Sequence, residues 1–272
     1  MNYRHAFHAG NFADLVKHAA LLRLLAAMAG DGSLRVIDTH AGRGLYDLAG
    51  PEAMKSGEAQ AGIVRLMAAS DAPSQFQALT AAVLALNRDR AVRRYPGSPW
   101  LIAEALRAGD TYLACELRAE EHRALHDLMT GRPGVRTLFA DGFDAALAEA
   151  PRSGPTLLLI DPPFERPDDY PRIVQVLARL QRRERALSAL VWLPLKDLET
   201  FDGFLRDLED EVPSPLLIAE TRMRPLTDPL KMNGCALVLL GAPHGMAHDL
   251  RAICGWTAET LGDGGEARVY GL

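Results

Sequence analysis

The chain has 272 residues, of which 48% are hydrophobic, a formal net charge of −5 and a pI near 5.9. This length supports one large core, and the acidic balance argues against a protein coated with basic charge for nucleic-acid binding. The three scattered cysteines, the lack of a long apolar run and a first segment without a signal-peptide core exclude a disulfide framework and a membrane anchor, and predict a cytoplasmic protein.

The first eighteen residues combine aromatic, imidazole, amide and basic side chains, whereas a frayed terminus is polar and simple. Asn11 is placed to cap a helix that runs to about Ala29. One interpretation is a lid in which Tyr3 and Arg4 contact a substrate and His18 contacts a cofactor. The alternative is an amphipathic helix packed on a sheet, which is favoured for His18 by itself.

A first buried strand is predicted to end at Asp38, and a glycine-containing loop follows it. Glycines at such a turn let backbone N–H groups approach a ligand closely. A dinucleotide-binding loop requires a third glycine where Asp47 stands, so that rival interpretation fits poorly. The spacing Asp38-x-x-x-Gly42-x-Gly44 resembles the cofactor loop of class I methyltransferases, with His40 in place of the usual glycine.

The alternation of strands and helices is interrupted between residues 48 and 109. Apolar helical stretches near residues 59–70 and 73–86, followed by a helix near 100–108, predict a helical insertion that shapes a substrate surface. Ser98, which precedes Pro99, has two interpretations. It is either the N-cap of the last of these helices or a hydroxyl directed at the carboxylate of a ligand.

Polar side chains follow the next two predicted strands. Glu116 ends the second strand, where a carboxylate can accept both hydroxyls of a ribose, and Asp141-Gly142 follows the third. Asp141 either caps the next helix or accepts from an adenine amino group. His122 and His126 have no third ligand nearby in sequence, so no metal site is predicted.

The segment Thr156–Ile160 is uncharged and mostly aliphatic, which predicts a strand buried on both faces, and Asp161-Pro162-Pro163-Phe164 follows it. This tetrapeptide resembles the signature of S-adenosylmethionine-dependent methyltransferases that act on exocyclic amino groups, chiefly adenine N6. Such an amine reacts poorly unless acceptors orient it, and Asp161 with the Pro162 carbonyl can do so, while Phe164 offers a face to a flipped base. A solvated aspartate at a Pro-Pro turn is the alternative.

The remaining chain continues the alternation of helices and strands. The expected order is helix 170–183, strand 190–195, helix 196–209, strand 215–220, strand 236–241 and helix 245–261. The last two strands have the spacing of an antiparallel hairpin, and Met232-Asn233-Gly234 is a turn signal between them.

Five motifs occur in an order that resembles the bacterial RlmJ family, which methylates N6 of one adenosine in 23S ribosomal RNA. The motifs are Tyr3-Arg4-His5-x-Phe7-His8-Ala9-Gly10-Asn11, Asp38-Thr39-His40-Ala41-Gly42, Tyr95-Pro96-Gly97-Ser98-Pro99, Ala140-Asp141-Gly142-Phe143 and Asp161-Pro162-Pro163. The resemblance implies the α/β class I S-adenosylmethionine-dependent methyltransferase fold, a Rossmann-like, seven-stranded and mostly parallel sheet. It also implies a single domain over 1–272, with a lid and helix at 1–30 and a helical insertion after the first strand at 48–109.

The same resemblance implies a role for particular residues. The expected S-adenosylmethionine pocket is lined by His18, His40, Ser98, Glu116, Asp141, Gly142 and Asp161. Asp161 is also the expected proton acceptor and acts with Pro162 and Phe164, while Tyr3 and Arg4 contact the RNA. Phe164 stands where better-known members have tyrosine, so no role is expected for a hydroxyl there.

The expected protein is a cytoplasmic, monomeric 23S ribosomal RNA adenine-N6 methyltransferase that needs no metal and no membrane. Two alternatives remain. A DNA adenine-N6 methyltransferase would use the same core, although no long separate recognition domain is evident in the sequence. A non-catalytic RNA-binding scaffold would use the same fold without the chemistry.

Overall fold

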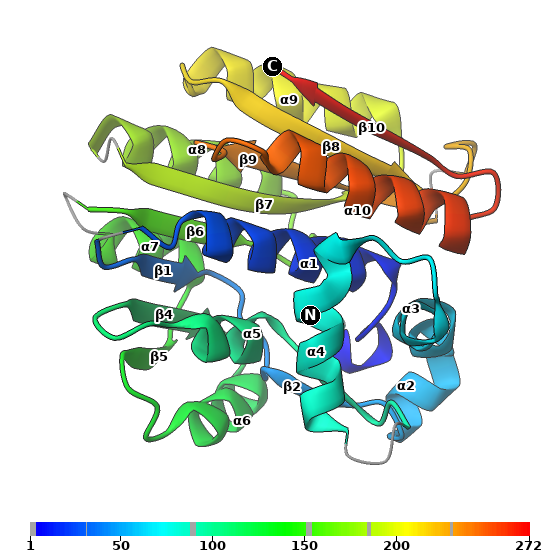
Figure 1. Cartoon of the computed structure of the whole chain (residues 1–272). Helices are drawn as coiled ribbons and strands as arrows, with labels where there is room; N and C mark the ends of the chain where they lie inside the picture. Colours follow the sequence, from blue (N-terminus) through cyan, green and yellow to red (C-terminus); the bar gives the residue numbers. More distant parts are fainter. Residues whose placement is uncertain (1–3, 31, 88–90, 151–153, 184–185, 229–230) are drawn as a thin grey trace.

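The computed structural model describes residues 4–30, 32–87, 91–150, 154–183, 186–228 and 231–272. A central eight-stranded sheet carries helices on both faces (Figure 1). The strands of this sheet are β1 (Arg35–Asp38), β4 (Thr111–Glu116), β5 (Val135–Phe139), β6 (Thr156–Ile160), β7 (Leu187–Leu195), β8 (Leu216–Arg222), β9 (Gly234–Leu240) and β10 (Glu266–Gly271). The longer helices are α1 (Phe12–Ala27), α4 (Gln77–Leu86), α5 (Ser98–Ala105), α6 (Ala119–Met129), α7 (Gly142–Glu149), α8 (Asp169–Arg183), α9 (Leu198–Glu211) and α10 (Met246–Leu261).

The strand order is β10-β8-β9-β7-β6-β1-β4-β5. The order reverses between β1 and β6, because the chain continues from β1 to β4 and β5 on one side and then crosses to β6 on the other side. Strand β1 pairs in parallel with both β4 and β6, which leaves the carboxyl ends of these strands at one edge. Ligands of open α/β sheets bind at the carboxyl edge where the strand order reverses. The residues after β1 and β6 therefore lie at the expected position for a site.

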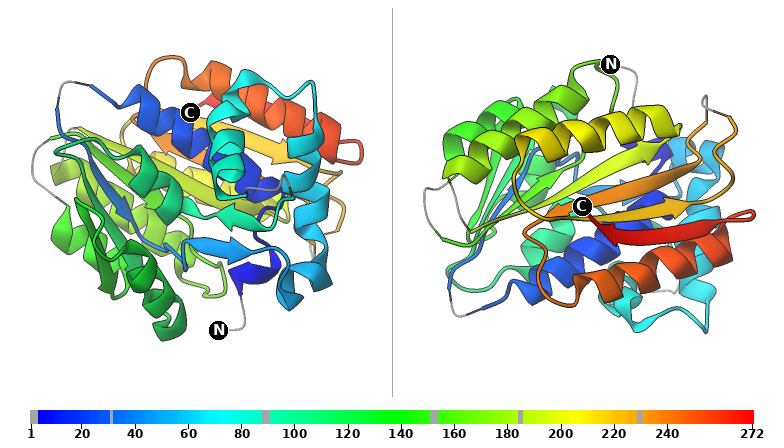
Figure 2. Two further views of the ribbon diagram at one scale, coloured as in Figure 1. Left: turned by 60° about the horizontal axis from the view of Figure 1, so that its bottom comes forward. Right: turned by 90° about the horizontal axis from the view of Figure 1, so that it is seen from above.

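The sheet has a separate hydrophobic core on each face, because side chains of a strand alternate between faces. In β6, Leu157 and Leu159 belong to the core under α1, α5 and α10, whereas Leu158 and Ile160 belong to the core under α7, α8 and α9. The view from above shows these two helix layers with the sheet between them (Figure 2). All of β6 is buried, which explains its uncharged sequence.

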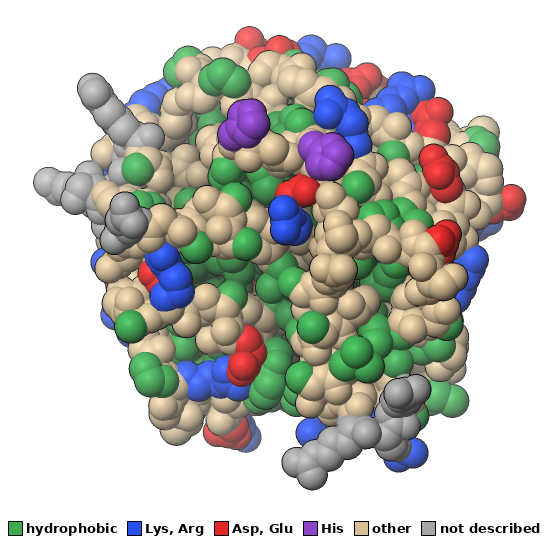
Figure 3. Space-filling model, viewed as in Figure 1, with side chains coloured by type: hydrophobic (Ala, Val, Ile, Leu, Met, Phe, Trp, Pro, Cys, Tyr) green, Lys and Arg blue, Asp and Glu red, His purple; other side chains and the backbone are tan. Residues whose placement is uncertain are grey.

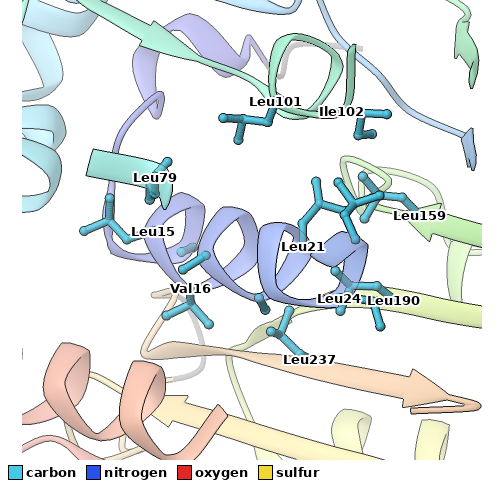
Figure 4. Packing of buried hydrophobic residues seen from close by; sticks show 14 of the residues in the cluster. Leu15, Val16, Leu21, Leu24, Leu79, Leu101, Ile102, Leu159, Leu190 and Leu237 are labelled. Carbon is cyan, nitrogen blue, oxygen red and sulfur yellow. The ribbon is translucent and has the colours of Figure 1, made fainter. Parts of the chain in front are cut away.

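Helix α1 lies against the middle of the sheet and connects the sheet to the insertion. Its Leu21 and Leu24 point toward Leu159 and Leu190 of the sheet, and its Leu15 lies beside Leu79 of α4 (Figure 4). Asn11 caps the helix by accepting a hydrogen bond from the Asp14 N–H, as predicted. This packing holds the first turns of α1 next to the carboxyl ends of β1 and β6.

The segment between β1 and β4 contains several short elements. They are β2 (Leu45–Asp47), α2 (Pro51–Ser56), a π-helical turn (Gln60–Val64), α3 (Arg65–Ala68) and β3 (Arg94–Pro96), with α4 before β3 and α5 after it. Strands β2 and β3 form a separate two-stranded antiparallel sheet, which the sequence did not reveal. The N-cap of α5 is Gly97, so the interpretation of Ser98 as that cap is wrong.

The expected seven-stranded sheet has an eighth strand. Strand β10 pairs antiparallel with β8 at the edge, and its side chains are half exposed, so its sequence lacked a buried-strand pattern. The antiparallel pairing of β8 with β9 is confirmed. The turn expected at residues 232–234 is wrong in detail, because Asn233 is fully buried and Gly234 already begins β9.

Candidate active site

A cavity of about 440 Å³ opens at the carboxyl edge of the sheet, between this edge and the start of α1. The structure brings nine of the predicted residues to its wall, namely His18, His40, Ser98, Glu116, Asp141, Gly142, Asp161, Pro162 and Phe164. Tyr3 lies outside the described residues, and Arg4 is exposed beside Glu52 rather than on the cavity wall. The size is that of a typical small-molecule site.

The carboxylate of Asp161 is paired with an ammonium group that the sequence analysis missed. Lys17 Nζ of α1 lies 2.5 Å from Asp161 Oδ2 and 3.0 Å from Asp14 Oδ1. The Lys17 side chain is only 6% exposed, so both ion pairs are shielded from water. Among the described residues none donates to Asp161 Oδ1, which leaves this oxygen for a ligand.

Asp14 fixes the position of the Lys17 ammonium through their ion pair and is itself held by two further contacts. Its Oδ2 accepts from the Gly10 N–H at 2.9 Å and lies 3.1 Å from His5 Nε2. Burial raises the pKa of Asp14, but attraction to His5 and Lys17 outweighs burial, and the pKa lies well below its usual range. Burial likewise lowers the pKa of Lys17, and the carboxylates of Asp161 and Asp14 reverse this, so Lys17 stays charged.

The loop after β6 presents an aromatic ring beside Asp161. Phe164 has a left-handed backbone with φ of 50°, which is strained for a residue other than glycine. Its ring centroid lies 4.9 Å from that of Tyr170 and 5.9 Å from that of Trp192. The three rings form an apolar wall on the β7 side of Asp161.

Glu116 is held at the end of β4 by backbone groups. Its Oε2 accepts from the Gly42 N–H at 3.0 Å, and its Oε1 accepts from the Arg118 N–H at 2.7 Å. Burial raises the pKa of the Glu116 carboxyl despite these two bonds. These two hydrogen bonds fix the orientation of the Glu116 carboxylate beside the glycine loop that follows β1.

The hydroxyl of Ser98 donates to a buried carboxylate rather than pointing freely into the cavity. Asp38 Oδ2 accepts from Ser98 Oγ at 2.8 Å and from the Tyr112 hydroxyl at 3.2 Å. Burial raises the pKa of Asp38 to about 7. This cluster ties the start of α5 to the end of β1 and the beginning of β4. The small exposed part of Ser98 lines the cavity.

Asp141 both caps a helix and makes an ion pair. Its Oδ1 accepts from the Phe143 N–H at 3.0 Å, and Arg172 of α8 donates to its two oxygens at 2.7 and 2.9 Å. Burial raises the pKa of Asp141, but the Arg172 hydrogen bonds outweigh burial and lower it. A Cβ on the next residue, Gly142, would lie 1.8 Å from the Thr39 carbonyl oxygen, so only glycine fits there.

His18 and His40, two of the four histidines on the cavity wall, are neutral at neutral pH because burial lowers the pKa of each. Burial lowers the pKa of His18 to about 3 and that of His40 to about 4. His18 Nδ1 lies 2.8 Å from the Tyr95 hydroxyl, and the His40 ring contacts the edge of Phe143 at a centroid distance of 4.9 Å. Neither ring therefore adds a positive charge to the cavity at neutral pH.

Lys17, Asp14 and Arg172 are the residues that the sequence analysis missed. The spacing of Asp14, Lys17 and His18 places all three on one helical face, which was the available signal. Among the described residues, no three His, Cys, Asp or Glu side chains are grouped to hold a metal ion. In the same part of the chain no helix is long and apolar enough to cross a membrane.

Comparisons with known proteins give a consistent result. A family model described as "Ribosomal RNA large subunit methyltransferase D, RlmJ" matches residues 31–271. Proteins named ribosomal RNA large subunit methyltransferase J from Escherichia coli and Haemophilus influenzae are each 30% identical, with 96% of this chain and 94% of each relative covered. A crystal structure of a Legionella pneumophila protein superposes with a TM-score of 0.87 at 28% identity, over 97% of this chain and 98% of that one.

Proposed function

Since the chain belongs to the RlmJ family of ribosomal RNA large subunit methyltransferases, we propose that it transfers a methyl group from S-adenosylmethionine to N6 of an adenosine in 23S ribosomal RNA. The observation that carries this proposal is the position of Asp161. Its carboxylate lies at the carboxyl end of β6, on the wall of a cavity, with Oδ2 paired to Lys17 and with no donor to Oδ1 among the described residues.

The residues on the β1, β4 and β5 side of the cavity fit S-adenosylmethionine. Glu116 is an oriented acceptor for the two ribose hydroxyls, and Asp141 is an acceptor for the adenine amino group. Gly142 leaves room where a side chain would collide with Thr39. In this proposal His18, His40 and Ser98 complete the wall, and Asp161 borders the methionine end.

S-adenosylmethionine, when bound, supplies a methyl group on a positively charged sulfur, which accepts the electron pair of the broken bond. The protein has to supply orientation, because the lone pair of an adenine amino group is delocalised into the ring. Asp161 Oδ1 accepts one N–H of the amino group, and the Pro162 carbonyl accepts the other. These acceptors stabilise the positive charge that develops on N6. Asp161 then takes the proton that N6 loses and passes it to water.

Lys17 keeps Asp161 in the position that this role needs. The buried ammonium stays charged between Asp14 and Asp161, so it fixes the direction of the Asp161 carboxylate. Asp14 and Gly10 in turn prevent Lys17 from moving.

The aromatic wall beside Asp161 fits an extruded adenine. Phe164 contacts both Tyr170 and Trp192, and Phe164 and Trp192 line the cavity. A flipped base gains stacking on such a wall and loses the stacking it had in the RNA. Phenylalanine supplies this face without a hydroxyl.

We also propose that the chain acts as a cytoplasmic monomer and as one methyltransferase domain over 1–272. Residues 1–30 then form the lid and first helix, with Tyr3 and Arg4 toward the RNA, and residues 48–109 form the insertion beside the cavity. The segment of Arg4 lies next to this insertion, since Arg4 Nη1 is 4.0 Å from Glu52 Oε1.

The direct test is an acceptor comparison. Purified protein is incubated with methyl-labelled S-adenosylmethionine and either protein-free 23S ribosomal RNA or duplex DNA. Label in the RNA alone is the expected result, and label in the DNA alone would replace the proposal with a DNA methyltransferase. Calorimetry with S-adenosylmethionine is the second measurement, because a non-catalytic scaffold would give no binding heat.

A further inference from the structure

We propose that Lys196 binds a phosphate of the RNA backbone beside the target adenosine, at the β7 side of the cavity. This inference rests on the proposed function. It assigns the backbone contact to the end of β7 and the neighbouring loop, rather than only to the N-terminal segment and the insertion.

Lys196 lies where the backbone of an extruded nucleotide has to remain. It directly follows β7, the strand next to β6 on the side away from β1. The cavity wall there consists of Trp192, Pro194, Lys196 and Met232, next to Asp161 and Phe164. The residues that fit the cofactor come from the other side of β6. A base that enters against Phe164 therefore leaves its ribose and phosphates at the mouth of the β7 side, where Lys196 is exposed.

A buried amide fixes the backbone of Lys196. Asn233 is fully buried, and its Nδ2 donates to the Lys196 carbonyl at 3.0 Å and to the Asp228 carbonyl at 2.7 Å. The Asn233 N–H donates to the Leu195 carbonyl at 2.9 Å. The end of β7 and the loop before β9 are thus held together. This is the role that the sequence analysis mistook for a turn.

Lys196 differs in its charge environment from other cations on the cavity wall. Lys17, Arg43, Arg166 and Arg172 each lie within 4.0 Å of a carboxylate oxygen. In the described ranges no carboxylate oxygen comes that close to Lys196 Nζ. The adjacent Asp197 uses its carboxylate to cap α9, where it accepts from the Thr200 N–H at 2.8 Å.

The neighbouring loop carries two more cations, of which only Arg224 has no carboxylate partner among the described residues. Arg224 is exposed, and within the described part of the chain no acidic side chain pairs with it. Lys231 is 64% exposed and lies 3.2 Å from Asp228. Both residues belong to the connection between β8 and β9. Gly234, where β9 begins, pairs with Leu195 at the end of β7. On the face of the molecule over α1, α4 and α10, basic and acidic side chains are interspersed (Figure 3).

A phosphate is the group that this arrangement fits. The net charge of −5 repels RNA as a whole, so binding requires local cations that no carboxylate neutralises. An exposed lysine on a fixed backbone is a point charge that contacts a phosphate oxygen without needing a particular geometry. The contact carries no sequence information and positions the nucleotide.

The experiment measures the affinity for protein-free 23S ribosomal RNA by filter binding over a series of salt concentrations. Lys196→Ala is expected to weaken binding several-fold and to reduce the salt slope by about 1, the value for one lost phosphate contact. Lys196→Arg is expected to restore both. The matched control is Arg251→Ala, which removes one exposed positive charge from α10 and is expected to bind RNA like the wild type.

Two further results decide the outcome. A salt slope in Lys196→Ala equal to that of the wild type, or equal losses in Lys196→Ala and Arg251→Ala, would overturn the inference. Calorimetry with S-adenosylmethionine on Lys196→Ala reports whether the fold and cofactor site are intact, because Lys196 lies outside that site. If the proposed function itself is wrong, the wild type does not methylate the RNA. If only the inference about Lys196 is wrong, the wild type methylates the RNA and Lys196→Ala keeps the wild-type salt slope.

Discussion

The two sides of the cavity hold their carboxylates by different means. On the β4 side, Glu116 is fixed by backbone N–H groups of Gly42 and Arg118. On the β6 side, Asp161 is fixed by the side chain of Lys17, a residue 144 positions earlier in the chain. The carboxylate proposed to bind the cofactor is therefore supported by backbone groups of the sheet loops, whereas the position of the carboxylate proposed to react depends on how α1 packs.

The largest effect is expected from removing the Lys17 ammonium, which holds Asp161 in place. Lys17→Met leaves the buried Asp14 and the partly buried Asp161 without their shared cation. We expect the free energy of unfolding to fall by about 3–5 kcal/mol, the usual cost of removing one partner from a buried ion pair. Denaturant unfolding measures this loss.

A control on the same helix shows whether burial is the cause. Arg23 pairs with Asp249 at 2.8 Å, but its side chain is 44% exposed. Arg23→Met is therefore expected to cost no more than about 1 kcal/mol. Equal losses in the two variants would show that Lys17 acts only as a helix residue and does not hold Asp161.

The second test separates the chemistry from the packing. Asp161→Asn keeps the size of the side chain, but its amide cannot replace an ionised acceptor. We expect methyl transfer to 23S ribosomal RNA to fall by about 100-fold or more, while the protein stays folded because Lys17 retains Asp14. Initial rates measure this effect, and Asp168→Asn, an exposed carboxylate close in sequence, is the matched control. A fully active Asp161→Asn would remove Asp161 from the mechanism.

Lys17 and Asp161 also show which part of the site could be predicted from the sequence and which part could not. Asp38 and Glu116 were found because each ends a recognisable strand, and Asp141 and Asp161 because each comes after one, since parallel strands end at one edge. The pairing of Lys17 with Asp161 was not found, since no local pattern states which strand end a helix will touch.

The fold shows the same division between local and tertiary information. Buried strands such as β6 were read from their apolar runs. Strand β10 was missed because it lies at the sheet edge with half-exposed, partly charged side chains. Its own sequence does not indicate that it pairs with β8 and contacts α10. Arg172 was missed for the reason that applies to Lys17, since α8 alone does not indicate that it reaches Asp141.

A third test addresses the aromatic wall on the β6 side. Phe164→Ala removes the face proposed for the adenine, and loss of one base–aromatic stack costs about 1–3 kcal/mol. We expect kcat/KM for 23S ribosomal RNA to fall by a corresponding factor of roughly 5 to 150. Phe164→Tyr keeps the ring next to Tyr170 and Trp192 and is expected to stay near the wild type. If both variants lost the same activity, the ring would not be a stacking face.

The smallest expected effect compares two adjacent residues of α1. Lys17 is buried and charged, whereas His18 is buried and neutral, with its pKa lowered to about 3 by burial. Between pH 3 and 6.5 the unfolded chain binds a proton at His18 that the folded chain does not, so stability falls as pH falls. From pH 7.5 to 6 this costs about 1 kcal/mol.

Denaturant unfolding at the two pH values checks this expectation. His18→Asn is expected to lose less stability over this interval than the wild type, because the titrating group is gone. His248→Asn removes an exposed histidine on α10 and is expected to keep the wild-type dependence. A pH dependence unchanged in His18→Asn would mean that His18 is not held neutral.

The most direct measurement is the identity of the modified nucleoside. Protein-free 23S ribosomal RNA is methylated by the purified protein, digested to nucleosides and separated by mass spectrometry against standards. A carboxylate and a carbonyl that orient an amino group beside an aromatic wall predict N6-methyladenosine as the product. A methyl group found instead on a ribose hydroxyl, on a ring carbon or on a guanine would contradict the role given to Asp161.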